Sequence, residues 1–232
     1  MARKILVSLI LIFSLFFPFH TSASPIFYDD FSNNQLRLEW TVFNEDPTKY
    51  SFSNGSIIVN TLPGDLNTND YKNLFLINNP VPNGDFQVTL KVISFITYAE
   101  YQQIDIVIYD DENNDLRCGN VQGGDRVWQL GKKVAGVWSD QNTGGPDAKA
   151  SSFFLRLVKT GNLFRQYYSL DGNIFHQTNG QINYGDRNPK YLGFAAFESH
   201  GVTATPIPVS IQYFSVDRLG KDSCILQLLL ND

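Results

Sequence analysis

Short runs of β-branched and aromatic residues recur along the chain, separated by clusters of glycine, asparagine, aspartate and proline. Seven such runs predict strands at residues 56–61, 85–95, 103–109, 152–159, 163–169, 191–197 and 209–216. The run at 103–109 alternates, so that its three isoleucines share one face while Gln103, Asp105 and Tyr109 share the other. No segment keeps a 3.6-residue apolar period over three turns, so helix should be scarce. The pattern predicts an all-β sandwich or barrel.

Two turn signals between residues 152 and 177 predict a meander of three strands. Gly161-Asn162 separates the first two strands, and Asp171-Gly172 separates the second from the third. Asp171 has a second interpretation as a catalytic carboxylate. Asp-Gly between aromatic and aliphatic residues is nevertheless a strong hairpin signal, because glycine adopts positive φ freely and aspartate tolerates it. The local pattern therefore favours a turn role for Asp171.

Both ends of the chain carry apolar stretches that lie outside the predicted strands. Arg3 and Lys4 precede an apolar stretch at 5–17, and Thr21-Ser22-Ala23 offers a small-residue cleavage site. This predicts a secretory signal peptide at 1–23 and an extracellular protein. The apolar stretch is shorter than the ~20 residues of a spanning helix, and no later stretch qualifies. Without repeats or linkers, residues 24–219 should form one domain, followed by an apolar tail at 220–232 to which we assign no role.

Charge and cysteine content narrow the classes of partner. The formal net charge is −5 and there is no basic run, which argues against nucleic acid and anionic lipid as partners. Cys118 and Cys224 could close a loop of about 100 residues in an exported protein, or Cys118 could be buried and Cys224 unpaired. Asn54-Gly55-Ser56 is a glycosylation sequon that matters only if the host glycosylates. The sequence does not address the oligomeric state.

Five segments follow one another in a recognisable order. They are FYDDF at 27–31 with Trp40, NEDP at 44–47 before GSIIV at 55–59, the FLRLV, GN and YSLDG pieces within 154–172, LGFAA at 192–196, and VSIQYFSVD at 209–217. This order resembles the concanavalin A-like jelly-roll domains of the DUF1349 group and of the C terminus of family 43 β-xylosidases. The resemblance implies a two-sheet antiparallel jelly roll, often an accessory module in carbohydrate-active proteins. It also places Asp171 on a hairpin turn.

The resemblance further implies a structural calcium ion near the chain ends. Asp30 and Asp217, with Asp29 beside them, fall in the matching segments, and oxygen ligands suit that ion. Solvated surface carboxylates explain the same residues, so both interpretations stay open. No other cofactor is expected, because the chain has no zinc-type His or Cys spacing, no G-x-S-x-G elbow and no phosphate-binding glycine loop that opens a helix.

Glycosidases of this fold class use a strand motif, Glu-x-Asp-x-(x)-Glu, and residues 103–109 match it only in part. Asp105 stands at the middle position, but Gln103 replaces the first glutamate, and Val107 or Ile108 the second. The carboxylate pair needed for hydrolysis is therefore missing. We expect a secreted, non-catalytic carbohydrate-binding or recognition module whose partner is a polysaccharide or oligosaccharide. The alternatives are a glycan hydrolase or lyase with an unrecognised carboxylate arrangement, and a surface protein that binds another protein.

The candidate ligand-binding residues combine polar and aromatic side chains. Gln103 and Asp105 would exchange hydrogen bonds with sugar hydroxyls, while Tyr101, Trp128 and Trp138 would stack on sugar rings. The two tryptophans fall in the Gly- and polar-rich region 121–145, which the pattern places between strands. A β core would account for aromatic residues equally well.

Asp105 has its own pair of interpretations. A carboxylate between isoleucines on a central strand is costly to desolvate alone. It should therefore pair with an arginine, Arg117 or Arg126, or stay solvated in an open groove. A structural salt bridge or a plain exposed strand residue would fit as well as a ligand-binding role.

Overall fold

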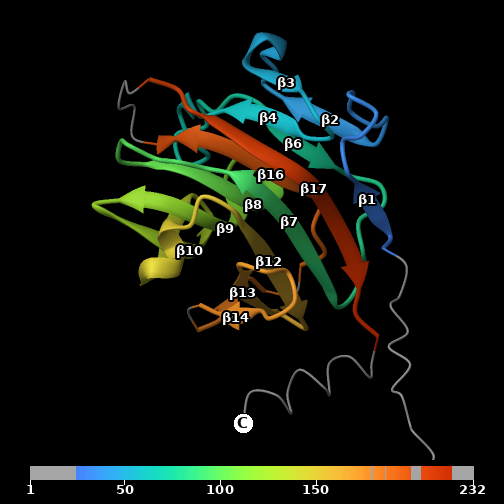
Figure 1. Cartoon of the computed structure of the whole chain (residues 1–232). Helices are drawn as coiled ribbons and strands as arrows, with labels where there is room; N and C mark the ends of the chain where they lie inside the picture. Colours follow the sequence, from blue (N-terminus) through green and yellow to red (C-terminus); the bar gives the residue numbers. More distant parts are fainter. Residues whose placement is uncertain (1–24, 179, 186, 200–204, 221–232) are drawn as a thin grey trace, which may run out of the picture.

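The computed structural model describes residues 25–178, 180–185, 187–199 and 205–220, which form two β-sheets packed face to face (Figure 1). The predicted signal peptide at 1–23, Cys224 and residues 221–232 of the predicted tail lie outside this part of the chain. Within it, no helix has the length and apolar character that crossing a membrane requires.

The first sheet, here called the β7 sheet, runs in the order β14-β13-β12-β7-β17-β4-β3, with β1 beside β17 and β15 beside β13. Its strands are β1 (Phe27–Asp29), β3 (Tyr50–Phe52), β4 (Ile57–Asn60), β7 (Phe86–Ser94), β12 (Phe153–Thr160), β13 (Leu163–Ser169), β14 (His176–Gln177), β15 (Ile182–Asn183) and β17 (Pro208–Arg218).

The second sheet, the β8 sheet, runs in the order β11-β10-β9-β8-β16-β6-β2, with β5 beside β16. Its strands are β2 (Trp40–Phe43), β5 (Leu62–Pro63), β6 (Leu74–Ile77), β8 (Gln102–Asp111), β9 (Asn114–Gly123), β10 (Asp125–Val134), β11 (Val137–Gly144) and β16 (Tyr191–Glu198). The described helices are two short 3₁₀ turns, η1 (Pro47–Lys49) and η2 (Pro146–Lys149). The strand pairs on the main path of both sheets are antiparallel, whereas β5 pairs with β16 in parallel.

Alternation along the strands fills the space between the sheets with apolar side chains. Ile104, Ile106 and Ile108 of β8 are all buried in this core, as the pattern predicted. At one end Trp40 contacts the rings of Phe194 and Phe214 edge to face, with centroids 5.3 and 5.2 Å away. The prediction of a two-sheet antiparallel sandwich with little helix is confirmed.

The seven predicted strands are all present, whereas β2, β3, β5, β6 and the three consecutive strands β9, β10 and β11 were among those not predicted. Strands β9, β10 and β11 occupy residues 114–144, much of which the pattern placed between strands. Many of their outward positions carry charged residues, amides or glycine in place of the usual strand formers. β11 is mostly exposed along its length, so no apolar face marks it as a strand.

A second apolar cluster lies on the opposite face of the β8 sheet. Val107 and Tyr109 of β8 meet Ala195 and Phe197 of β16 there, and the segment at 64–73 folds over them through Leu66 and Tyr71. Asp65 shapes this segment by accepting hydrogen bonds from the backbone N–H groups of residues 67 and 68 (2.7 and 2.9 Å). Part of the outer face of the β8 sheet is therefore covered, and the rest is open.

The Asp171-Gly172 signal marks a connection from β13 to β14, although not the two-residue turn that the pattern predicted. The loop has six residues, 170–175, and Gly172 alone among them has positive φ (+81°). The Asp171 carboxylate accepts from Ser169 Oγ and from the backbone N–H groups of Asn173 and Ile174, at 2.8–3.0 Å. These hydrogen bonds lower its pKa, which fits a turn role.

Gly172→Val should destabilise the domain by about 2 kcal/mol, because a branched residue resists this positive φ. A Cβ at this position would also lie 2.6 Å from the Phe154 ring. Asp171→Asn keeps an oxygen that can accept the same hydrogen bonds and should cost less than about 1 kcal/mol. Urea denaturation of both variants checks this. Equal stability of the two variants would contradict the assignment.

Candidate functional site

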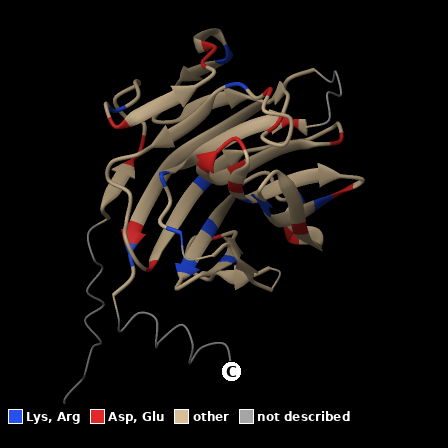
Figure 2. Ribbon diagram, turned by 180° about the vertical axis from the view of Figure 1, so that it is seen from behind, with Lys and Arg blue, Asp and Glu red and all other residues tan. Residues whose placement is uncertain are grey.

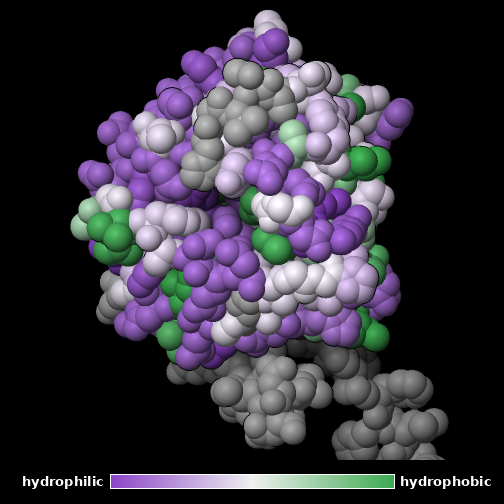
Figure 3. Space-filling view, turned by 90° about the vertical axis from the view of Figure 1, so that its left-hand side faces the viewer, coloured by the Kyte–Doolittle hydropathy of each residue, from purple (hydrophilic) through white to green (hydrophobic). Residues whose placement is uncertain are grey.

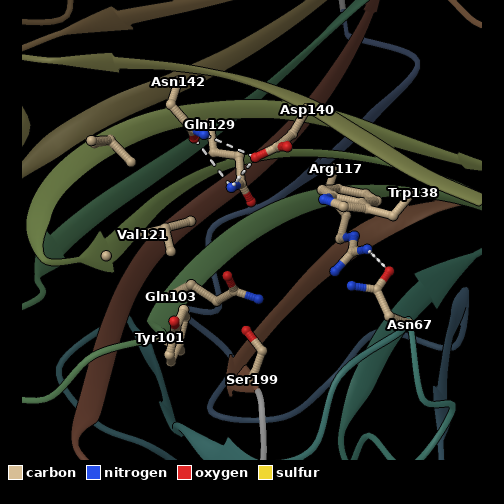
Figure 4. A pocket seen from close by; sticks show the side chains of 12 residues that line it. Asn67, Tyr101, Gln103, Arg117, Val121, Gln129, Trp138, Asp140, Asn142 and Ser199 are labelled. Carbon is tan, nitrogen blue, oxygen red and sulfur yellow. Dashed lines mark hydrogen bonds between the residues drawn. The ribbon is translucent and has the colours of Figure 1, made fainter.

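The open part of the outer face of the β8 sheet holds a pocket of about 410 Å³ (Figure 4). Strands β8 to β11 supply most of its lining, and Asn67, Tyr101 and Ser199 reach it from the segments beside the sheet. Tyr101 and Trp138 lie at opposite ends of the pocket, with amide side chains between them. The side of the molecule that Figure 3 shows is largely hydrophilic, with apolar side chains exposed in separate spots.

Strand register explains how distant residues meet on this face. One row of paired residues crosses five neighbouring strands: Ala195 on β16, Asp105 on β8, Gly119 on β9, Gln129 on β10 and Asn142 on β11. Residues opposite one another on neighbouring strands point to the same side of the sheet. The row therefore gathers one carboxylate and two amides on either side of Gly119, which has no side chain to fill the space.

Gln103 forms part of the pocket floor and has an unoccupied amide. The residue is only 3% exposed. Its side chain makes no hydrogen bond within the described part of the chain, and Figure 4 shows the amide directed into the pocket. Nearly all buried amides in proteins are hydrogen-bonded. This amide is therefore available to a ligand as both donor and acceptor.

A hydrogen-bonded wall stands across the pocket from Gln103. Gln129 Nε2 donates to Asp140 Oδ2 at 2.8 Å and to Asn142 Oδ1 at 3.2 Å. Asn142 Nδ2 donates to the same Asp140 oxygen at 2.9 Å. The other Asp140 oxygen takes part in none of these bonds. The wall thus presents fixed amide groups and one acceptor oxygen to the pocket.

Arg117 joins the pocket to a buried group of charges. Its Nε lies 3.0 Å from Asp115 Oδ1, and Lys133 Nζ lies 3.4 Å from Asp115 Oδ2. The guanidinium carbon is 3.7 Å from the centroid of the Trp138 ring, and Nη2 donates to Asn67 Oδ1. Lys133 also donates to the Leu66 carbonyl. Arg117 therefore fixes the position of both Trp138 and Asn67 in the pocket wall.

Asp105 lies beneath this pocket rather than in it. The residue is 1% exposed, and neither carboxylate oxygen has a hydrogen-bond partner among the described residues. Oδ1 leans over Gly119, where a Cβ would come within 1.6 Å of it. Burial raises the pKa of Asp105 to about 7, against the opposing effect of the Arg117 charge. Asp105 is therefore mostly uncharged in the mildly acidic range.

Both expectations for Asp105 need correction. It neither pairs with an arginine nor stays solvated, because Arg117 is bound to Asp115 and the face above Asp105 is closed. Arg126 points elsewhere and donates to Asn120 and to the backbone carbonyls of Phe95, Lys149 and Ala150.

The three aromatic candidates have different positions. Tyr101 and Trp138 line the pocket, and their role in ligand binding stays a prediction. Tyr101 has a left-handed backbone (φ +65°), and its carbonyl accepts from the Ser199 N–H at 3.2 Å. Trp128 is 2% exposed and stacks on Tyr168 in the core, with centroids 4.7 Å apart. The prediction that Trp128 stacks on a ligand is therefore corrected.

The residues proposed for calcium have other partners. Asp30 accepts from the Ser32 N–H, and Asp217 accepts from Gln87 and Ser215 (both 3.4 Å). Asp29 accepts from Trp40 Nε1 and the Phe31 N–H. No group of three or more His, Cys, Asp or Glu side chains in the described ranges could hold a metal ion. A calcium site at Asp30 and Asp217 stays an untested expectation.

Most of the polar pocket lining was not predicted from the sequence. Arg117, Gln129, Asp140 and Asn142 lie on the three strands that the pattern missed. A period of two was present in the residues that line the pocket, since Trp138, Asp140 and Asn142 occupy every second position of β11. This alternation was the available signal.

No protein-family model matches the chain, and no curated protein matches it in sequence.

Solved structures share the fold. The GH43 protein BlXynB from Bacillus licheniformis superposes with a TM-score of 0.71 at 20% identity, over 83% of this chain and 39% of that one. A xylan β-1,4-xylosidase from Bacillus halodurans gives 0.68 at 15% identity, over 82% and 39%. A β-glucanase from B. licheniformis gives 0.58 at 14% identity, over 83% and 98%. The chain spans about two fifths of the length of the first two.

At these identities the likeness establishes the fold alone, a concanavalin A-like jelly roll. The predicted resemblance is confirmed at that level. None of these structures is described as a member of the DUF1349 group, so the resemblance to that group stays a prediction. The chemistry of the pocket must therefore be read from its own residues.

The carboxylates near the pocket are poorly placed for glycoside hydrolysis. Asp105 on β8 and Asp140 on β11 are three strands apart, about 14 Å at ordinary strand spacing. Hydrolysis uses two carboxyl groups about 5 to 9.5 Å apart on either side of the scissile bond. Asp115 is closer to Asp105 but is bound to Arg117 and Lys133. The pocket offers binding groups without an acid–base pair among the described residues.

Proposed function

We propose that the protein is a secreted, non-catalytic carbohydrate-binding module whose pocket on the outer face of the β8 sheet takes part of a polysaccharide or oligosaccharide. The observation that carries this is Gln103, a buried amide that has no hydrogen-bond partner in the described ranges and points into the pocket. Sugar hydroxyls both donate and accept hydrogen bonds, so they match an amide better than a purely apolar ligand would.

The remaining lining supports the same class of ligand. Tyr101 and Trp138 provide aromatic surface at the two ends of the pocket, and the wall at Gln129 and Asn142 provides fixed amides. Aromatic surface with a few placed polar groups is a common composition of ligand pockets. The fold is shared with proteins described as a xylan β-1,4-xylosidase and a β-glucanase, so xylan and β-glucan fragments are the first ligands to test.

A glycan hydrolase is the second candidate, favoured by one observation. Asp105 has a pKa of about 7, because burial disfavours its charged form, and such a carboxyl can act as a general acid. Its side chain is closed off from the pocket, and the nearby Asp115 carboxylate is bound to Arg117 and Lys133, which favours binding over hydrolysis.

Isothermal titration with xylohexaose and a β-glucan hexasaccharide, combined with a reducing-end assay, separates these functions. Gln103→Ala and Trp138→Ala should each weaken binding by about 1–3 kcal/mol, roughly five- to 150-fold, through an unpaired ligand hydroxyl or lost aromatic contact. Tyr28→Ala, an exposed residue on the β7 sheet, is the matched control and should bind as the wild type does.

Each outcome of that titration has a defined meaning. Binding without release of reducing ends, weakened by the two pocket variants alone, supports the proposal. Release of reducing ends by the wild type would support the hydrolase instead. Absence of both binding and release would contradict both, and would favour a surface protein that binds another protein.

A further inference from the structure

Asp105 is a buried titratable group directly beside the pocket floor. It lies two residues from Gln103 on the same face of β8, so the two side chains are neighbours. Its flanking positions are Ala195 on β16 and Gly119 on β9, neither of which can donate a hydrogen bond from its side chain. Within the described ranges, neither carboxylate oxygen receives a hydrogen bond. Burying Asp105 in its charged form would be costly unless a cationic side chain moved close enough to pair with it.

The charged groups around Asp105 come from three elements. Strand β9 contributes Arg117 and Asp115, β10 contributes Lys133 behind Asp115, and the segment at 64–73 contributes Asp65. Strand β16 contributes Ala195 and Phe197, which carry no charge, and the Cys118 thiol lies on the core side. Among the described residues, Arg117 is the cation whose charge acts directly on Asp105, while Asp115 and Asp65 oppose its ionisation.

Ionisation of Asp105 would compete for Arg117. This guanidinium now contacts Asp115, Asn67 and the Trp138 ring. A negative charge beneath it would draw it away from Trp138 and Asn67, which form the pocket wall. Loss of that support would loosen the groups that a ligand needs.

We propose that Asp105 is a proton-linked positioning residue of the pocket, whose protonated form leaves Arg117 in place and whose ionisation lowers affinity for the ligand. This inference rests on the proposed function. Burial raises the pKa of Asp105 to about 7, which puts the change in the neutral range. A bound ligand holds Arg117 in place and so favours the proton on Asp105. By linkage, affinity then falls as the pH rises through this titration.

The test is the dissociation constant of the wild type for xylohexaose and the β-glucan hexasaccharide between pH 5.5 and 8.5. It should rise roughly tenfold across this range, as expected for a shift of about one pKa unit on binding. Asp105→Asn removes the titration and should give constants that change by less than about twofold. Asp111→Asn, an exposed carboxylate on the same strand, should keep the wild-type profile.

A merely structural role for Asp105 would change the affinity without changing its pH profile. A flat wild-type profile, or a rise that persists in Asp105→Asn, would overturn the inference while leaving the proposed function intact. If neither oligosaccharide binds at any pH, the proposed function fails and the inference fails with it.

Discussion

Between pH 4 and pH 8, the free energy of unfolding of the wild type should fall by about 4 kcal/mol more than that of Asp105→Asn. Burial raises the pKa of Asp105 from its ordinary value of 3.8 to about 7, a difference of about three units at about 1.4 kcal/mol each. Because the folded state holds the proton more tightly, the stabilising contribution is fully present below about pH 4. It is lost as the pH rises through about 7. An asparagine side chain does not titrate, so the variant has no such loss.

Urea denaturation of both proteins at several pH values checks this. The substitution also buries an amide, and the cost of this burial does not depend on pH. It therefore cancels when the stabilities of one protein at two pH values are subtracted. Asp111→Asn is the control, since hydrogen bonds from Asn113 and Asn114 lower the pKa of Asp111 and it titrates below this range. A constant stability difference from pH 4 to pH 8 would show that Asp105 is not a neutral acid in the folded protein.

Gly119→Ala should destabilise the domain by as much as about 3 kcal/mol, the upper part of the range for overpacking. A Cβ at this position would lie 1.6 Å from Asp105 Oδ1 and 3.0 Å from the Ile104 carbonyl oxygen. The carboxylate would have to move within a closely packed site where it is already 1% exposed. Glycine at 119 therefore keeps the space that Asp105 occupies.

A double-mutant cycle isolates this contact. In an Asp105→Ala background the clash with the carboxylate disappears, so Gly119→Ala should cost about 1–3 kcal/mol less than it does alone. Gly123→Ala on the same strand has nothing within 4 Å of its new Cβ and should be close to neutral. Strict additivity of the Asp105 and Gly119 changes would mean that the two positions do not share this space.

The parts of the fold that the sequence predicted are those with a strong apolar alternation. Residues 103–109 place three isoleucines in the core, and the structure confirms the direction in which they face. Gln103 and Asp105 were assigned to the outer face for the same reason, which is correct. The pattern could not predict that Asp105 is buried, because burial on this face depends on the neighbouring strands and on the segment at 64–73, which are distant in the sequence.

Strands β9 to β11, which are among those that the sequence did not predict, carry most of the pocket lining. Several outward positions of β9 to β11 carry polar side chains or glycine, and β11 is exposed along most of its length, which weakens the apolar signal by which strands are recognised. The same ambiguity misplaced Trp128. It and Trp138 lie in one polar region, and only cross-strand register shows that the first faces the core and the second the pocket.

Acidic residues outnumber basic ones in the chain, 23 to 18. In the ribbon of Figure 2, both Lys and Arg positions and Asp and Glu positions are spread over several strands and loops. That nucleic acid is not a partner stays a prediction from the composition, and the pocket is the feature whose ligand would decide the function.

The most direct test of the central claim is a ¹H–¹⁵N spectrum of the tryptophan indoles during titration with xylohexaose and the β-glucan hexasaccharide. The chain has three tryptophans. Trp138 lines the pocket, whereas Trp40 and Trp128 are buried in the core and serve as internal references. The account predicts that the Trp138 signal, assigned with Trp138→Phe, shifts together with the Gln103 and Gln129 side-chain amides while the two references stay in place. Shifts confined to residues of the β7 sheet, or no shift with either sugar, would contradict it.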